Sequence, residues 1–131
     1  MTSPVGDRSF IPEGWHTVTP RIVVHGARQL VEFLAQVFGA TGEFQETRPS
    51  EVRIGDSVVM VSEAGARRPM PAFLYVYVGN TDTVYERARE AGALTIEPPF
   101  ETPYGDRRCM VEDQWGNVWQ VATYRKGQNA A

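Results

Sequence analysis

Three aromatic residues alternate with three aliphatic ones over residues 73–78 of the chain. Successive side chains of a β-strand point to opposite faces, so Phe73, Tyr75 and Tyr77 share one face of a predicted strand. A helix predicted over residues 82–91 would cover the opposite, aliphatic face. The rings then line a ligand cavity, where they would stack on a flat molecule, or they form an interface between modules or chains.

The same alternation, applied to the other predicted strands, places polar and soft side chains around that cavity. Arginine side chains there would bind a carboxylate or a phosphate, unless they are rim residues paired in solvent. Glu51 is the only carboxylate so placed and is a weak candidate for a general base. Tyr104, on a proline-rich loop, would be a lid, and Trp115, in a turn, would cap the pocket or contact a partner. The predicted ligand-binding residues are Thr19, Arg21, Arg53, Met60, Phe73, Tyr75, Tyr77, Tyr104, Arg108, Trp115 and Gln120.

The elements that position these residues occur twice, each time in the order βαβββ. The first unit has predicted strands at 17–24, 42–47, 51–54 and 57–62, with a helix at 30–38 that Gly39 ends. The second has predicted strands at 73–78, 94–97, 107–112 and 117–124, with a helix at 82–91 that Gly92 ends, and a loop at 98–105. A duplicated unit that cannot close its own core implies that two units pair, within one chain or between two chains.

Length and composition predict one globular domain in 131 residues. We expect a flexible N-terminal arm at residues 1–14, the domain at 15–125 with modules 15–63 and 72–125, and a disordered tail at 126–131. The net charge of -3 argues against a nucleic-acid partner. No apolar run approaches the roughly 20 residues that cross a bilayer, and residues 1–11 lack the apolar block of a signal peptide, so we expect no membrane association and a cytoplasmic location.

One cysteine excludes an internal disulfide and a thiolate-rich zinc site. Cys109 alternates onto a helix-facing side, so we expect a buried, inert thiol. Trp119 falls on the same side of its strand and is predicted to lie in the core. Asp106 and Arg107 are predicted to be structural ion-pair partners rather than catalysts.

Four short segments resemble one known family in their order and spacing. They are Trp-His-Thr-Val-Thr-Pro at 15–20, Ile-Gly-Asp-Ser-Val-Val-Met at 54–60, Gly-Asp-Arg at 105–107 and Asp-Gln-Trp-Gly-Asn-Val-Trp at 113–119. They look like the glyoxalase/bleomycin-resistance/extradiol-dioxygenase superfamily, also called vicinal oxygen chelate, over residues 16–124. The resemblance implies an α+β fold in which paired βαβββ modules form a cup-shaped mixed sheet, often completed in a homodimer.

Metal-dependent members of that superfamily bind their ion at four symmetric places. The resemblance carries those places to Thr19, Met60, Phe73 and Gln120, and a site of that type needs His or Glu at most of them. None is present, and the neighbouring positions are no better, so we expect no metal and no cofactor. The only two histidines, His16 and His25, lie about 30 Å apart along one predicted strand, too far to share an ion within one chain.

Three functions stay open on these grounds. The first is a metal-free protein that sequesters a planar or aromatic small molecule, as drug-resistance members of the superfamily do. The second is a superfamily enzyme, such as a lyase, isomerase or dioxygenase, or a cofactor-free enzyme that uses Glu51 or the tyrosines. The third is a partner-binding domain without a cavity ligand. The sequence favours the first, and leaves the ligand unnamed.

Overall fold

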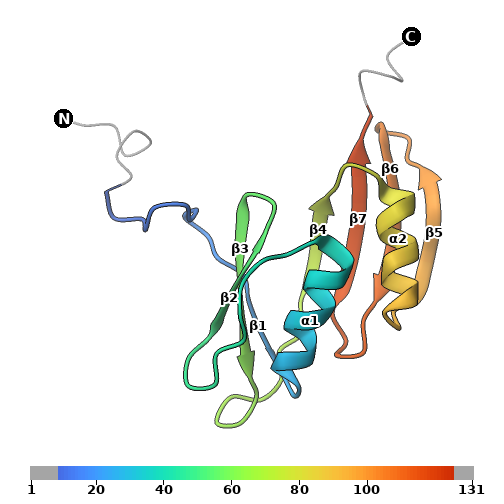
Figure 1. Ribbon diagram of the computed structural model, residues 1–131. Helices are drawn as coiled ribbons and strands as arrows, with labels where there is room; N and C mark the ends of the chain where they lie inside the picture. The colour runs from blue at the N-terminus through green and yellow to red at the C-terminus, as the bar shows by residue number, and fades with distance from the viewer. Residues whose placement is uncertain (1–8, 126–131) are drawn as a thin grey trace.

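The computed structural model describes residues 9–125, so the predicted features at 1–8 and 126–131 lie outside the described residues. This part of the chain forms seven strands and two helices, whose arrangement Figure 1 shows. Their bounds are β1 Arg21–Val24, α1 Ala27–Phe38, β2 Ser50–Ile54, β3 Ser57–Glu63, β4 Phe73–Tyr77, α2 Thr81–Glu90, β5 Leu94–Glu101, β6 Asp106–Glu112 and β7 Val118–Tyr124. Neither described helix is long and apolar enough to cross a membrane.

The strands form two sheets that repeat one topology. The first has the order β1-β3-β2 and the second the order β4-β7-β6-β5. In each sheet the first strand of the unit lies parallel to its last strand, and the remaining pairs are antiparallel. The predicted α+β fold class is confirmed, and the predicted repeat is present, although the first unit has the order βαββ and only the second has the predicted order βαβββ.

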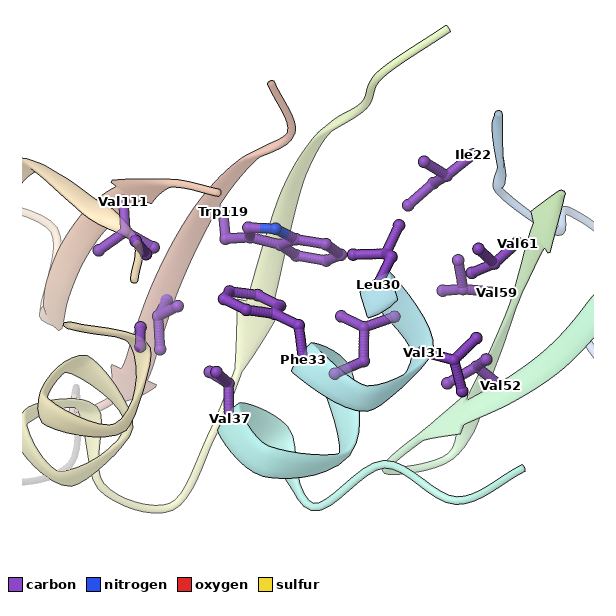
Figure 2. Close-up of a cluster of buried hydrophobic side chains, with 14 of the residues drawn as sticks. Ile22, Leu30, Val31, Phe33, Val37, Val52, Val59, Val61, Val111 and Trp119 are labelled. Carbon is purple, nitrogen blue, oxygen red and sulfur yellow. The ribbon is translucent and has the colours of Figure 1, made fainter. Parts of the chain in front are cut away.

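Helix α1 packs against both sheets and joins their cores. Its apolar residues recur at helical spacing, and Gly39, at φ 66°, ends it in the left-handed conformation that a helix C-terminus favours. Figure 2 shows Phe33 beside Trp119 of the second sheet and Val31 beside Val52 of the first. The helix-facing sides of both sheets therefore share one core, and the outer face of each sheet points away from it.

The turn between β6 and β7 fixes Trp119 in that core. The buried Asp113 carboxylate accepts hydrogen bonds from the backbone N–H groups of Trp115 and Asn117, from the Asn117 amide and from the Trp119 indole, at 2.8–2.9 Å. Trp119 is fully buried, as predicted. Cys109 is also fully buried, and burial raises the pKa of its thiol to about 11.

The strand predicted at residues 42–47 is wrong. The structure has there only an isolated bridge between Thr41 and Arg53. Gly42 adopts φ 124°, outside the extended range of a strand, and the backbone N–H of Gln45 donates to the Ser50 hydroxyl rather than to a ladder. The first sheet consequently has one strand fewer than the second.

The strand predicted at 94–97 extends to Glu101, through two prolines that had indicated a loop. Proline lacks the N–H that a ladder needs, but β5 is an edge strand of its sheet. Its pairing with β6 also shifts register between Thr95 and Glu97 and between Glu97 and Phe100. The edge position and the irregular register together accommodate Pro98 and Pro99.

Candidate functional site

The outer face of the second sheet gathers most of the predicted ligand-binding residues. Strand β4 contributes the three alternating rings, and the registers place Gln120 of β7 opposite Tyr75 and Phe100 of β5 opposite Arg108 of β6. We call this surface the aromatic face. Its residues are Phe73, Tyr75, Tyr77, Leu94, Glu97, Phe100, Tyr104, Asp106, Arg108, Met110, Glu112, Val118 and Gln120.

The aromatic face is open in the single chain. The side chains of Phe73 and Tyr77 are 67% and 62% exposed, and Tyr75 is 37% exposed. The rings of Tyr75 and Tyr77 lie 5.3 Å apart with an interplanar angle of 54°. A ligand held here needs a second surface to bury its other side, and one chain does not supply it from the described residues.

A groove of about 280 Å³ adjoins the aromatic face at the junction of the two sheets. It lies between strand β4 and the turn that joins β2 to β3, and its exposed lining is mostly apolar. The lining residues are Pro20, Ile54, Gly55, Asp56, Ser57, Val59, Leu74, Tyr75, Val76, Tyr77 and Trp119. The rings that the sequence singled out therefore border a concavity as well as an open face.

A chain of hydrogen bonds crosses the aromatic face. The Tyr75 hydroxyl donates to the Asp106 carboxylate at 2.6 Å, and the Tyr77 hydroxyl donates to the same oxygen at 3.4 Å. The Tyr75 and Tyr104 hydroxyls lie 3.4 Å apart, and Arg108 donates to the Tyr104 hydroxyl at 2.6 Å. Because the one hydroxyl proton of Tyr75 lies on Asp106, the proton shared with Tyr104 must belong to Tyr104.

The direction of these hydrogen bonds determines which chemical roles the tyrosines can have. Burial and then the hydrogen bond to Asp106 raise the pKa of Tyr75, and burial and the charge of Asp106 raise the pKa of Tyr77. Both phenols therefore stay neutral around pH 7 and act as hydrogen-bond donors rather than as bases. Tyr104 holds its proton only in a long contact, so that proton is available to an acceptor on a ligand.

Arg108 is neutralised where it lies. Its guanidinium group forms an ion pair with Glu97 at 3.2 Å and lies over the ring of Phe100, 5.2 Å from its centroid. Its side chain is 16% exposed, and its Nε atom is buried without a hydrogen-bond partner. These contacts hold Arg108 against the sheet, and Arg108 in turn positions Tyr104 through its hydrogen bond to the hydroxyl.

The remaining predicted residues of the strands share the outer face of the first sheet. Met60 lies opposite both Arg21 and Glu51, and Arg53 lies opposite Val58. The Arg21 side chain donates to the Ser62 hydroxyl at 3.1 Å. Arg53 donates to the Gly14 carbonyl at 3.0 Å. Glu51 is exposed on this face, in a different sheet from the tyrosines of the aromatic face, so one chain does not place it beside them.

Trp115 and Thr19, two further predicted residues, lie outside the strands. Trp115 packs edge-on against Phe33 of α1, with ring centroids 5.7 Å apart, and its indole borders Gly26. It therefore lies on the core side of the second sheet. Thr19 precedes β1 and lies outside the strand.

Asp106 is the residue of the site that sequence reasoning missed. It was predicted to be a structural ion-pair partner, and this is wrong, since it forms no ion pair with any described residue and accepts from two tyrosines instead. Arg107 does form structural ion pairs, with Asp82 and Glu101. Alternation along β6 puts Asp106 on the same face as Arg108, a signal that was available in the sequence.

The donor chemistry of the described residues does not fit a divalent metal of the glyoxalase type. Of the four places that would hold it, Met60, Phe73 and Gln120 lie on strands and Thr19 just before one. They offer a thioether, a hydrocarbon ring and neutral oxygens, and no group of three or more His, Cys, Asp or Glu residues gathers among residues 9–125.

The fold and the site define a class, a duplicated α+β domain with an open aromatic sheet face. Residues 15–121 match the Glyoxalase/Bleomycin resistance protein/Dioxygenase superfamily. The chain belongs to this superfamily. No curated protein sequence matches it.

Solved structures with the same fold are similar in shape and distant in sequence. TioX from Micromonospora sp. ML1 has a TM-score of 0.70 and 21% identity, with 83% of this chain and 98% of that chain covered. A glyoxalase/bleomycin resistance protein/dioxygenase family enzyme from Burkholderia phytofirmans PsJN has a TM-score of 0.70 and 20% identity, covering 81% and 96%. A superfamily member from Sphaerobacter thermophilus DSM 20745 has a TM-score of 0.67 and 18% identity, covering 82% and 96%. Likeness at these identities shows the fold.

Proposed function

We propose that the protein binds a planar or aromatic small molecule on the aromatic face, without a metal, and sequesters it. The observation that carries this proposal is the exposed row of Phe73, Tyr75 and Tyr77 on one face of an otherwise well-packed sheet. Large apolar groups exposed together mark a binding surface in a soluble domain. Flat rings stack on flat ligands, and the fixed hydroxyls of Tyr75 and Tyr104 would orient polar groups of the ligand.

We further propose that two copies of the chain form a homodimer in which the first sheet of one copy covers the aromatic face of the other. The helix-facing sides of both sheets pack into one shared core, so the outer faces of the two sheets cannot cover each other within one chain. In a homodimer, Arg21, Arg53, Met60 and Glu51 of one copy would lie across from the rings of the other. The cup would then be complete, and the chain would act there as a dimer in the cytoplasm, where its single thiol stays reduced.

Ligand titration followed by tryptophan fluorescence tests the binding proposal. A planar aromatic probe should quench the emission of the wild-type protein with saturation at one site per chain, and Tyr75→Ala should lose this response because the stacking surface and the anchor on Asp106 go together. Tyr85→Ala is the matched control, because Tyr85 lies on α2 and bonds Thr95, away from the face. Equal quenching of all three proteins would contradict the proposal.

Metal analysis separates binding from metal-dependent catalysis. We expect far less than one equivalent of Ni, Zn, Mn or Fe per purified chain, and no change in probe affinity after chelator treatment. One equivalent of any of these ions would favour a superfamily enzyme instead.

Sedimentation analysis tests the proposed homodimer. We expect the wild-type protein to sediment as a dimer and Phe73→Ser to shift it toward the monomer.

A further inference from the structure

The charges on the aromatic face are mostly negative. Alternation and the strand registers place Glu97, Asp106 and Glu112 on this face, together with one arginine, Arg108. The ion pair of Arg108 with Glu97 cancels two of these charges. The two other carboxylates have no cationic partner within 4.0 Å among the described residues.

Asp106 is the more informative of the two carboxylates about the ligand, because it is buried, with an exposed fraction of 2%. An ionised carboxylate in such a place costs free energy unless hydrogen bonds or a positive charge offset the lost hydration. Its side chain receives two phenol hydroxyls, at 2.6 and 3.4 Å, and both are neutral donors. These hydrogen bonds replace part of the lost hydration, but no cation among the described residues neutralises the negative charge, which lies at the start of β6 beside the rings.

The tyrosine rings beside Asp106 attract a cation as well. A cation over the face of an aromatic ring is held by the electron density of that ring, more strongly when it is shielded from water. Tyr75 and Tyr77 donate their hydroxyl protons to a carboxylate, which increases the electron density of their rings. Their ring faces and the carboxylate behind them thus favour the same kind of ligand.

We propose that the aromatic face selects flat ligands that carry a positive charge, such as a protonated ring amine. The inference deepens the proposed function and rests on it. The ring system of the ligand would stack on Phe73 and Tyr77, and its cationic group would lie over Tyr75, in front of Asp106. An anionic ligand of the same shape is disfavoured, because Arg108 is already paired and Asp106 repels it.

Pairing of two copies would not reverse this preference. The outer face of the first sheet carries Arg21 and Arg53 and one carboxylate, Glu51. Across a completed cup the carboxylates would still outnumber the arginines. Arg21 and Arg53 also already donate to groups of their own chain, the Ser62 hydroxyl on β3 and the Gly14 carbonyl in the segment before β1.

Three tricyclic probes of similar size and different charge test the proposal on the full chain near neutral pH. They are 9-aminoacridine, a cation; acridine, which is neutral; and anthracene-9-carboxylate, an anion. We expect the cation to bind about tenfold more tightly than the neutral ring and the anion to bind most weakly. Affinity for the cation should fall as salt is added, while affinity for the neutral ring should change little.

Two charge-removing variants assign the effect to Asp106. Asp106→Asn, which still accepts from Tyr75, should weaken binding of 9-aminoacridine about tenfold and leave acridine unchanged. Glu86→Gln removes an equal charge from the exposed side of α2 and should change neither affinity. The salt series on the wild type needs no variant, so the test holds even if Asp106→Asn misfolds.

The outcomes distinguish the proposed charge preference from the proposed binding of a planar ligand, on which it rests. Equal affinities for the cation and the neutral ring, or an affinity for the cation that salt does not lower, would overturn the charge preference and leave the binding proposal standing. Failure of all three probes to bind would overturn both. Weakened binding of the cation in Glu86→Gln as much as in Asp106→Asn would show that net charge, rather than the aromatic face, is responsible.

Discussion

The hydroxyl of Tyr75 on β4 reaches across strand β7 and donates to the Asp106 carboxylate at the start of β6, at 2.6 Å. This contact links the two residues that best define the site. It holds the ring of Tyr75 in one orientation and gives a nearly buried carboxylate a strong hydrogen-bond donor.

The contact predicts how the tyrosines titrate. The pKa of Tyr75 lies above its ordinary value of about 10, because of burial first and the bond to Asp106 second. Asp106→Asn removes the negative charge, so the pKa of Tyr75 should fall toward the ordinary value. Phenolate absorbance against pH should show part of the tyrosine ionisation moved to lower pH in the variant, because Asp106 raises the pKa of both Tyr75 and Tyr77. A curve unchanged by the substitution would refute the role given to Asp106.

Cys109 makes a second pH prediction. Its folded pKa is raised from 9.0 to about 11, so above about pH 9 the unfolded chain loses the thiol proton while the folded chain keeps it. This contribution to the free energy of unfolding is complete below about pH 9 and is lost as pH rises toward about 11. Urea midpoints of Cys109→Ala should therefore fall less steeply over this window than those of the wild type. Parallel slopes would contradict the assignment.

Asp113 should be a major determinant of stability. Asp113→Ala leaves four donors without their acceptor, including the indole of the buried Trp119, and we expect the free energy of unfolding to fall by about 3 kcal/mol. Asp56→Ala, in the exposed turn between β2 and β3, is the control and should change it by less than about 0.5 kcal/mol. Chemical denaturation measures both, and similar values would contradict the account of the turn.

Two glycines with positive φ should differ in their tolerance of a side chain. A Cβ on Gly42, at φ 124°, would overlap the backbone carbonyl of Glu51, whereas a Cβ on Gly39, at φ 66°, meets open space. Gly39→Ala should cost about 1 kcal/mol, the usual strain of the left-handed region. Gly42→Ala should cost roughly 2–3 kcal/mol because a backbone atom must also move. Thermal denaturation with matched conditions ranks the two, and the reverse order would be inconsistent with the structure.

Local patterns in the sequence predicted most of the fold. Alternation and helical spacing located both helices and five of the seven strands closely, because each such element buries one face and leaves its period in the sequence, whereas the strand predicted at 17–24 begins only at Arg21. The errors at 42–47 and at 98–101 have specific causes. Gly42 breaks an apparent strand through its backbone angle, and β5 carries Pro98 and Pro99 because it is an edge strand.

The site was predicted in part. Alternation placed Phe73, Tyr75 and Tyr77 together, since their positions depend only on one strand. The partnership of Asp106 with Tyr75 depends on the order of strands β4, β7 and β6, which no local pattern contains. Trp115 was given an exposed role because it sits in a turn, yet that turn folds back onto α1.

The proposed function requires that the aromatic face binds a planar ligand without a metal. Calorimetric titration of chelator-treated protein with 9-aminoacridine tests it most directly, comparing the wild type with a Phe73→Ser, Tyr77→Ser double variant. The account predicts saturable binding at one site per chain in the wild type and loss of that heat in the variant. Binding that appears only after a divalent metal is restored, or that persists in the variant, would contradict it.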